Sequence, residues 1–243
     1  MFSVGRNKLA VTLGHIGTLL LLLTSSIAAQ PADESDPDEM QTDEAALTEA
    51  YGADPHEFGE LRLPPGNGPF PVLIIVHGGC WRSGVGSLNY MAPLAAALAA
   101  RGVATWNVEY RQIGDSGGGW PGTFLDWGAA ADHLRSLAKS HPLDLTRVSA
   151  LGHSAGAPAA LWLAARGKLP KASPIRGDDP LPITSAIAIA GPLDLASFAG
   201  SDLRACGSPV VRQLMGGTPG ERRDRYAQAS PAELLPLGVP QYL

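Results

Sequence analysis

The sequence predicts an α/β fold in which helices cover both faces of a mostly parallel central sheet. Hydrophobic residues make up 45% of the 243 residues and charged residues 17%, a composition typical of globular domains. Pro71–Val76 is a continuous apolar run of strand length, as in strands that are buried on both faces. Around it, strand-like and amphipathic segments alternate, and such alternation is typical of parallel α/β sheets.

The expected elements follow one another with clear boundaries. Strands are predicted at Glu57–Leu63, Pro71–Val76, Val103–Tyr110, Val148–Leu151 and Ser185–Ala190. Helices are predicted at Asn89–Arg101, Phe124–Lys139 and Ala155–Ala165. In the first helix the spacing i, i+3, i+7 predicts one apolar face made of Met91, Leu94 and Leu98. In the second helix the apolar face comprises Phe124, Trp127, Ala131, Leu134 and Leu137.

The N-terminus has the pattern of a secretory signal peptide over residues 1–29. Arg6 and Lys8 precede an apolar run over Leu9–Leu23, and Ser26-Ile27-Ala28 supplies a small-x-small cleavage site. We therefore expect export to the periplasm or the medium, with no stable membrane insertion of the mature chain. An uncleaved membrane anchor is the alternative, because roughly 20 apolar residues can span a bilayer.

Residues 30–50 are predicted to be an acidic, flexible leader ahead of a folded domain over residues 51–243. Eight acidic residues and no basic residue lie between Asp33 and Glu49, and such a segment buries too little apolar surface to order itself. The rest of the chain is close to neutral. It contains no basic stripe, so we expect no nucleic-acid partner.

The two cysteines, Cys80 and Cys206, leave one question open. Exported proteins retain disulfides, but pairing requires Cα atoms within bonding range, which the sequence does not give. Two cysteines are too few for a zinc site of the usual spacing, and no His/Asp cluster has ligand spacing. No metal or cofactor is expected.

Gly152-His153-Ser154-Ala155-Gly156 fits the pattern G-x-S-x-G between an apolar strand and a helix. In this context the turn is too sharp for side chains at the glycine positions, and it lifts the serine hydroxyl above the sheet. Ser154 is therefore the predicted nucleophile. An ordinary strand–helix turn with a capping serine is the alternative.

His77-Gly78-Gly79-Cys80-Trp81 follows the buried strand directly. Backbone N–H groups of a glycine-rich loop can approach a substrate oxygen closely. Matched to the pattern H-G-G-G, this loop would donate from Gly79 and Cys80. With the N–H of Ala155 they would form an oxyanion hole.

Together the two motifs resemble the α/β-hydrolase superfamily. More narrowly, H-G-G-x-W with G-H-S-A-G is similar to the branch that holds carboxylesterases and hormone-sensitive-lipase-like, feruloyl-esterase-like and kynurenine-formamidase-like enzymes. The resemblance covers residues 56–243 and implies hydrolysis of a small-molecule carboxylic ester or small amide through an acyl-enzyme. Two positions depart from the pattern: Ala157 stands where many relatives have a third glycine, and Pro158 removes an N–H from the first helical turns.

The resemblance also implies an acid and then a histidine after the serine, and neither is evident. All six histidines precede Ser154, so no base is found in the chain: His15, His56, His77, His133, His141 and His153. Asp194 is a weak candidate for the acid, because in relatives such an aspartate caps the next helix. Val239–Leu243 reads as the start of one more core strand, after which relatives place the acid and the histidine. We therefore expect a C-terminally truncated domain that lacks the last strands and a helix, with a sheet edge and an apolar face exposed.

Trp81, Trp120 and Tyr110 are candidates for the wall of the substrate pocket. Two functional alternatives remain beside the serine hydrolase. One is a catalytically inactive hydrolase fold that binds a ligand. The other is an interaction module that recovers its missing piece from another polypeptide.

Overall fold

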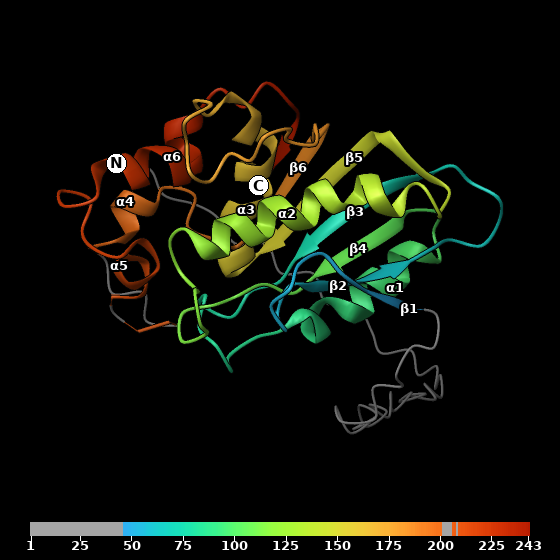
Figure 1. Cartoon of the computed structure of the whole chain (residues 1–243), viewed down its shortest axis with the longest axis horizontal. Helices are drawn as coiled ribbons and strands as arrows, with labels where there is room; N and C mark the ends of the chain where they lie inside the picture. The colour runs from blue at the N-terminus through green and yellow to red at the C-terminus, as the bar shows by residue number, and fades with distance from the viewer. Residues whose placement is uncertain (1–45, 201–205, 208) are drawn as a thin grey trace, which may run out of the picture. The chain divides into compact units, whose positions relative to one another are not determined.

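The computed structural model describes residues 46–200, 206–207 and 209–243. The predicted signal peptide and most of the acidic leader lie outside the described residues. Residues 42–243 form one compact unit, and seven strands of this unit make a single sheet in the order β1-β2-β4-β3-β5-β6-β7 (Figure 1). The sheet and its helices confirm the predicted α/β class.

The elements have the following bounds. The strands are β1 (Ala46–Ala50), β2 (Phe58–Arg62), β3 (Phe70–Val76), β4 (Ala104–Val108), β5 (Leu143–His153), β6 (Ser185–Ile189) and β7 (Gln241–Tyr242). The α-helices are α1 (Ala92–Ala99), α2 (Gly122–Leu137), α3 (Ala157–Ala165), α4 (Leu195–Phe198), α5 (Val210–Met215) and α6 (Arg223–Ala229). Short 3₁₀ helices are η1 (Leu88–Met91), η2 (Ser154–Gly156), η3 (Arg166–Lys168) and η4 (Pro231–Leu234).

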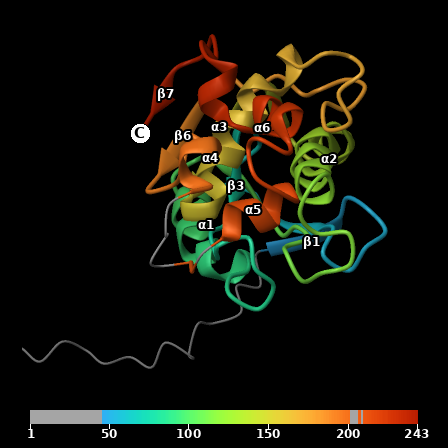
Figure 2. The same cartoon turned by 90° about the vertical axis from the view of Figure 1, so that its left-hand side faces the viewer.

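The parallel core of the sheet is built on β3. This strand pairs in parallel with β4 and β5, β5 pairs in parallel with β6, and β1 and β2 extend the β4 side as antiparallel strands. Val72, Ile74 and Val76 pack in the core on the side of α2 and α3, whereas Leu73 and Ile75 pack with α1 on the other side. Figure 2 shows α1 and α2 on opposite sides of β3. The prediction of a strand buried on both faces is confirmed.

The first predicted helix is shorter than expected and presents a different face. It divides into η1 and α1, with Pro93 in the first turn of α1. Met91 and Ala95 are buried, but Leu94 is 37% exposed, so the prediction that Leu94 lies on the apolar face is wrong. The helical register begins only at Ala92, and the buried positions are therefore Met91, Ala95 and Ala99, with Leu98 partly buried beside them.

The second predicted helix is confirmed as α2. All five residues of its predicted apolar face are buried. They pack against the aromatic part of the core, where Phe124 meets Trp127 with ring centroids 4.8 Å apart and Trp162 of α3 at 5.6 Å. These contacts between aromatic rings hold α2 and α3 together on the same face of the sheet.

The prediction that residues 30–50 form a flexible leader is wrong for its last five residues. Ala46–Ala50 form β1, which pairs antiparallel with β2 along its whole length. Leu47 is 44% exposed, so apolar burial does not order this segment. Pairing of its backbone N–H and C=O groups with an otherwise open sheet edge does so instead.

The C-terminal segment adds a short strand, as the sequence predicts. Gln241 and Tyr242 of β7 pair in parallel with Ala186 and Ile187 of β6. β7 is the outer strand on this side of the described sheet. Within the described residues, no helix is long and apolar enough to cross a membrane.

Candidate active site

Ser154 stands at the sharp turn between β5 and α3. Its φ of 53° lies in the left-handed region, which a serine adopts only when the surroundings enforce it. Close packing enforces it here. A Cβ added at Gly152 would overlap the carbonyl oxygen of Gly156, and a Cβ at Gly156 would overlap that of Val76 in β3. The two glycines of the motif are therefore required by contact, as the sequence predicts.

A third glycine, which the sequence analysis did not single out, completes this packing. A Cβ on Gly191, just after β6, would overlap Ala157 Cβ and the carbonyl oxygen of Ser154. The helix itself begins at Ala157, so Pro158 lies in its first turn. Its missing N–H is one that the helix leaves unpaired at this position, so this departure from the pattern removes no helical hydrogen bond.

The predicted oxyanion loop lies against the serine. A Cβ built on Gly78 would come within 3.1 Å of Ser154 Cβ and of the His153 carbonyl oxygen. The following residues Gly79, Cys80 and Trp81 have φ values of 115°, 57° and 54°, so three consecutive residues are left-handed. The structure thus brings together Ser154, Ala155 and the loop that carries Gly79 and Cys80.

A buried network supports this loop from behind. His77 is fully buried, and its Nε2 lies 2.8 Å from Glu109 Oε1 while its Nδ1 lies 2.6 Å from the Gly78 carbonyl oxygen. Both ring nitrogens therefore lie against oxygen acceptors. Glu109 also accepts the backbone N–H groups of Leu88 at 3.1 Å and of Tyr110 at 3.1 Å. Sequence reasoning missed Glu109, although a carboxylate at the end of a buried strand is a signal for a buried partner.

Asp194 acts as a helix cap. Its Oδ1 accepts the backbone N–H groups of Ala196 and Ser197, each at 3.1 Å, and its Oδ2 accepts the Ser197 hydroxyl at 2.5 Å. These hydrogen bonds, led by the Ser197 hydroxyl, hold the pKa of Asp194 below its usual value. Both carboxylate oxygens accept hydrogen bonds from the first turn of α4. Asp194 therefore has the capping role that the sequence analysis considered, rather than that of an acid that orients a histidine.

No histidine of the described residues reaches the Ser154 hydroxyl by a hydrogen bond. His153 Nδ1 forms a hydrogen bond with the Tyr90 hydroxyl at a distance of 2.7 Å. His133 stacks on Trp106 of β4, and burial lowers its pKa. His141 precedes the start of β5, whereas Ser154 follows its end, and a strand advances about 3.3 Å per residue, so they lie at opposite ends of the sheet.

Two of the candidate pocket residues are buried in the core. Trp81 is 1% exposed and Tyr110 is fully buried, and their predicted place in the wall of a substrate pocket stays a prediction. Tyr110 stacks on His77 at 4.4 Å between centroids and donates its hydroxyl to the His77 carbonyl oxygen. Trp120 is partly buried and lies between Phe124 and the guanidinium of Arg225, 5.7 Å from its ring centroid.

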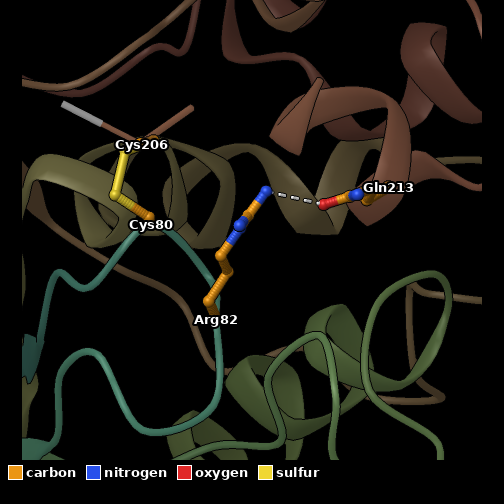
Figure 3. Close-up of a disulfide and its surroundings, with 4 residues drawn as sticks. All are labelled: Cys80, Arg82, Cys206 and Gln213. Atoms are coloured by element: carbon orange, nitrogen blue, oxygen red, sulfur yellow. Dashed lines mark hydrogen bonds between the residues drawn. A yellow bond between two sulfur atoms is a disulfide. The ribbon is translucent and has the colours of Figure 1, made fainter. Parts of the chain in front are cut away.

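The two cysteines form a disulfide, which answers the question that the sequence left open. Cys80 and Cys206 have Cα atoms 5.4 Å apart, within the usual range for a bridge, and 126 positions separate them in the sequence. The bridge begins at one of the predicted oxyanion donors (Figure 3). It therefore links the loop beside Ser154 to the segment that leads into α5.

The fold and this arrangement are those of the α/β-hydrolase architecture. Solved esterases share the fold. The bifunctional GH43-CE protein of Bacteroides eggerthii has a TM-score of 0.66 and 19% identity, over 82% of this chain and 30% of that one. Thermogutta terrifontis esterase 2 phosphoramylated by tabun has a TM-score of 0.63 and 19% identity, over 81% and 69%. A bacterial heroin esterase has a TM-score of 0.61 and 21% identity, over 82% and 66%.

The family follows from the sequence match. The model of the BD-FAE family matches residues 60–240, and the chain belongs to that family. The matched range includes the predicted oxyanion loop and the predicted nucleophile elbow. No curated protein sequence matches the chain. The chain spans 30% of the length of the Bacteroides eggerthii protein that it resembles.

Proposed function

We propose that this protein hydrolyses carboxylic esters, or small amides, through an acyl-enzyme on Ser154. The observation that carries the proposal is the left-handed Ser154 at the end of β5, with the oxyanion loop in contact with it. Two of the structural relatives are named as a carbohydrate esterase and a heroin esterase, and esterase 2 of Thermogutta terrifontis is phosphoramylated by tabun. A covalent reaction of this kind is what an activated nucleophile provides.

The proposed reaction has two steps. The Ser154 oxygen attacks the ester carbonyl, and the negative charge that develops on the carbonyl oxygen is held by the N–H groups of Gly79, Cys80 and Ala155. The alcohol leaves with a proton, and water then releases the acid and restores the serine hydroxyl. Both steps need a group that accepts the serine or water proton, and we assign that role to none of the described residues.

The second candidate is a hydrolase fold that binds its ligand without turnover. The observation that favours it is the Ser154 hydroxyl itself, which within the described residues makes no hydrogen bond to a histidine or a carboxylate. A serine without a base is a weak nucleophile. Removal of a complete triad still leaves roughly 10³–10⁴-fold catalysis over water from the oxyanion hole and binding.

Two assays on the 243-residue chain and its Ser154→Ala variant separate the candidates. Hydrolysis of p-nitrophenyl acetate measures turnover, and intact-mass analysis after treatment with a fluorophosphonate measures attack by the serine. Turnover and a single adduct that both disappear in Ser154→Ala support the acyl-enzyme proposal. A folded chain whose turnover and labelling equal those of Ser154→Ala supports the binding protein.

We also propose that the chain is exported. Its support is the signal-like N-terminus together with the disulfide, since disulfides persist in oxidising compartments. The test is expression in a bacterial host with an intact secretion system, followed by N-terminal sequencing of the protein outside the cytoplasm. A mature chain that begins at Ala29 or Gln30 agrees with export and cleavage, and a chain retained with residue 1 intact contradicts it.

A further inference from the structure

The oxyanion loop adopts a conformation that its own residues disfavour. Cys80 and Trp81 are both left-handed, and for residues with a Cβ this conformation costs roughly 1–2 kcal/mol each. Two such residues in succession persist only where contacts from outside the loop hold them. The direction of the Cys80 N–H depends on this conformation, because rotation of the peptide between Gly79 and Cys80 would turn the N–H away.

Trp81 is held by its own contacts. Its side chain is 1% exposed in the core, and its carbonyl oxygen accepts the Ile113 N–H at 2.6 Å. Arg82 closes a turn onto the Gly79 carbonyl oxygen at 3.0 Å. These contacts fix the end of the loop. Cys80 is held in addition by a group bonded to its side chain.

That group is the sulfur of Cys206. Figure 3 shows the bridge from Cys80 to Cys206, and beside it Arg82, which donates to Gln213 Oε1 of α5 at 3.0 Å. The same loop is thus joined to one segment at two points. The Arg82 contact is exposed and polar, whereas the disulfide is covalent and packs against the core.

The helix that follows Cys206 in the chain, α5, is packed in the core. Four residues of α5 are buried: Val210, Val211, Leu214 and Met215. The Leu214 carbonyl oxygen accepts the Trp120 N–H at 2.7 Å, and the Met215 carbonyl oxygen accepts Arg225 Nη1 at 2.8 Å. These contacts fix α5 against the core, and Cys206 itself is partly buried against the same core.

We propose that Cys206 is a positioning residue for the oxyanion hole. Through the disulfide it holds Cys80 in the left-handed conformation that directs the Cys80 N–H toward the carbonyl bound at Ser154. The proposal rests on the proposed function. Its physical content is separate, since it states that the covalent tether, rather than the loop sequence, fixes the loop.

The test compares the parent with Cys206→Ser and with the control Gln213→Ala. The control removes the Arg82 contact at an exposed position and keeps the disulfide. Hydrogen exchange of the amides of residues 79–82 is measured beside that of β3, together with kcat and KM for p-nitrophenyl acetate at a temperature where all three are folded.

In Cys206→Ser we expect at least tenfold faster exchange in residues 79–82 with β3 unchanged. Loss of one oxyanion donor costs about 10²–10³ in kcat, so a donor that is only partly misplaced should cost about tenfold in kcat, with KM within twofold. Gln213→Ala should match the parent in both measurements. A disulfide that only stabilises the fold would lower the melting temperature and leave loop exchange and kcat unchanged, which would overturn the proposal.

Two further arms keep the result decisive. If Cys206→Ser does not fold, the parent is reduced under native conditions with a phosphine and then reoxidised, and the loop exchange and kcat should change and recover together. If the parent shows no turnover that depends on Ser154, the proposed function fails. The exchange measurement then still decides whether Cys206 fixes the loop, and unchanged exchange contradicts it.

Discussion

Replacement of Gly156 by alanine tests whether the elbow is fixed by steric contact. The added Cβ would overlap the Val76 carbonyl oxygen and lie 2.7 Å from the His77 carbonyl oxygen. Both atoms are backbone, at the end of β3 and the start of the oxyanion loop. Neither can turn aside as a flexible side chain can, so β3 and α3 must separate.

The size of the effect follows from this contact. Overpacking of a well-filled site costs about 1–3 kcal/mol, and we expect about 3 kcal/mol because the clash is with main chain on two residues. For a urea m-value of about 2 kcal/mol/M, the midpoint of unfolding should fall by about 1.5 M. Gly167→Ala is the matched control. A Cβ at exposed Gly167 meets nothing within 4 Å, and this change should raise stability by about 0.4–1 kcal/mol.

The assay is urea unfolding followed by tryptophan fluorescence for the parent and both variants. The buried tryptophans Trp81, Trp106, Trp127 and Trp162 report loss of the core. A Gly156→Ala variant within 0.5 kcal/mol of the parent, or as stable as Gly167→Ala, would refute the argument that contact with β3 requires this glycine.

Three more changes test the supports of the site. Glu109→Gln removes the carboxylate beside His77 and replaces one acceptor of backbone N–H groups by an amide NH2; it should lower the free energy of unfolding by about 1–3 kcal/mol, measured by urea denaturation. Asp194→Ala removes the cap of α4 and should cost about 1 kcal/mol at neutral pH; because the folded-state pKa of Asp194 is lowered, this difference is complete above the unfolded-state pKa and disappears as the pH falls through the folded-state value. Replacement of both Cys80 and Cys206 by serine should cost up to about 5 kcal/mol, from the loop entropy of a bridge across 126 positions, and should lower the melting temperature.

Each of these expectations has a clear contrary result. A Glu109→Gln variant as stable as the parent would mean that the carboxylate charge contributes nothing behind the oxyanion loop. A constant difference between the parent and Asp194→Ala from neutral pH to acid would show that the capping carboxylate is not the source of its stability. The number of free thiols in the parent, counted before and after reduction, is the control for complete oxidation. If the parent is fully oxidised, an unchanged melting temperature for the serine double variant would contradict the bridge.

The sequence pattern predicted an element correctly where the structure of that element depends on its own residues. The apolar run of β3, the five-residue face of α2 and the two glycines around Ser154 are read correctly, because burial on both faces, helical spacing and a sharp turn each leave a local trace. The same reading placed Leu94 on the wrong side, since periodicity alone does not show where a helix starts after a 3₁₀ turn.

Contacts between distant segments were not readable in this way. β1 is ordered by the open edge of β2, which its own acidic composition does not indicate. The partner of His77 is Glu109, one strand further along the chain, and the two meet because β3 and β4 are neighbours in the sheet. Trp81 and Tyr110 are core residues for the same reason.

The sequence by itself determined the class of the fold, the sharp turn at Gly152–Gly156 and the glycine-rich loop before it, because these depend on residues adjacent in the chain. Only the tertiary structure decided that Cys80 pairs with Cys206, that Asp194 is occupied as a cap, and that the loop lies in contact with Ser154. Each of these contacts depends on how the folded chain places the groups relative to one another, and the spacing of residues in the sequence does not give that placement.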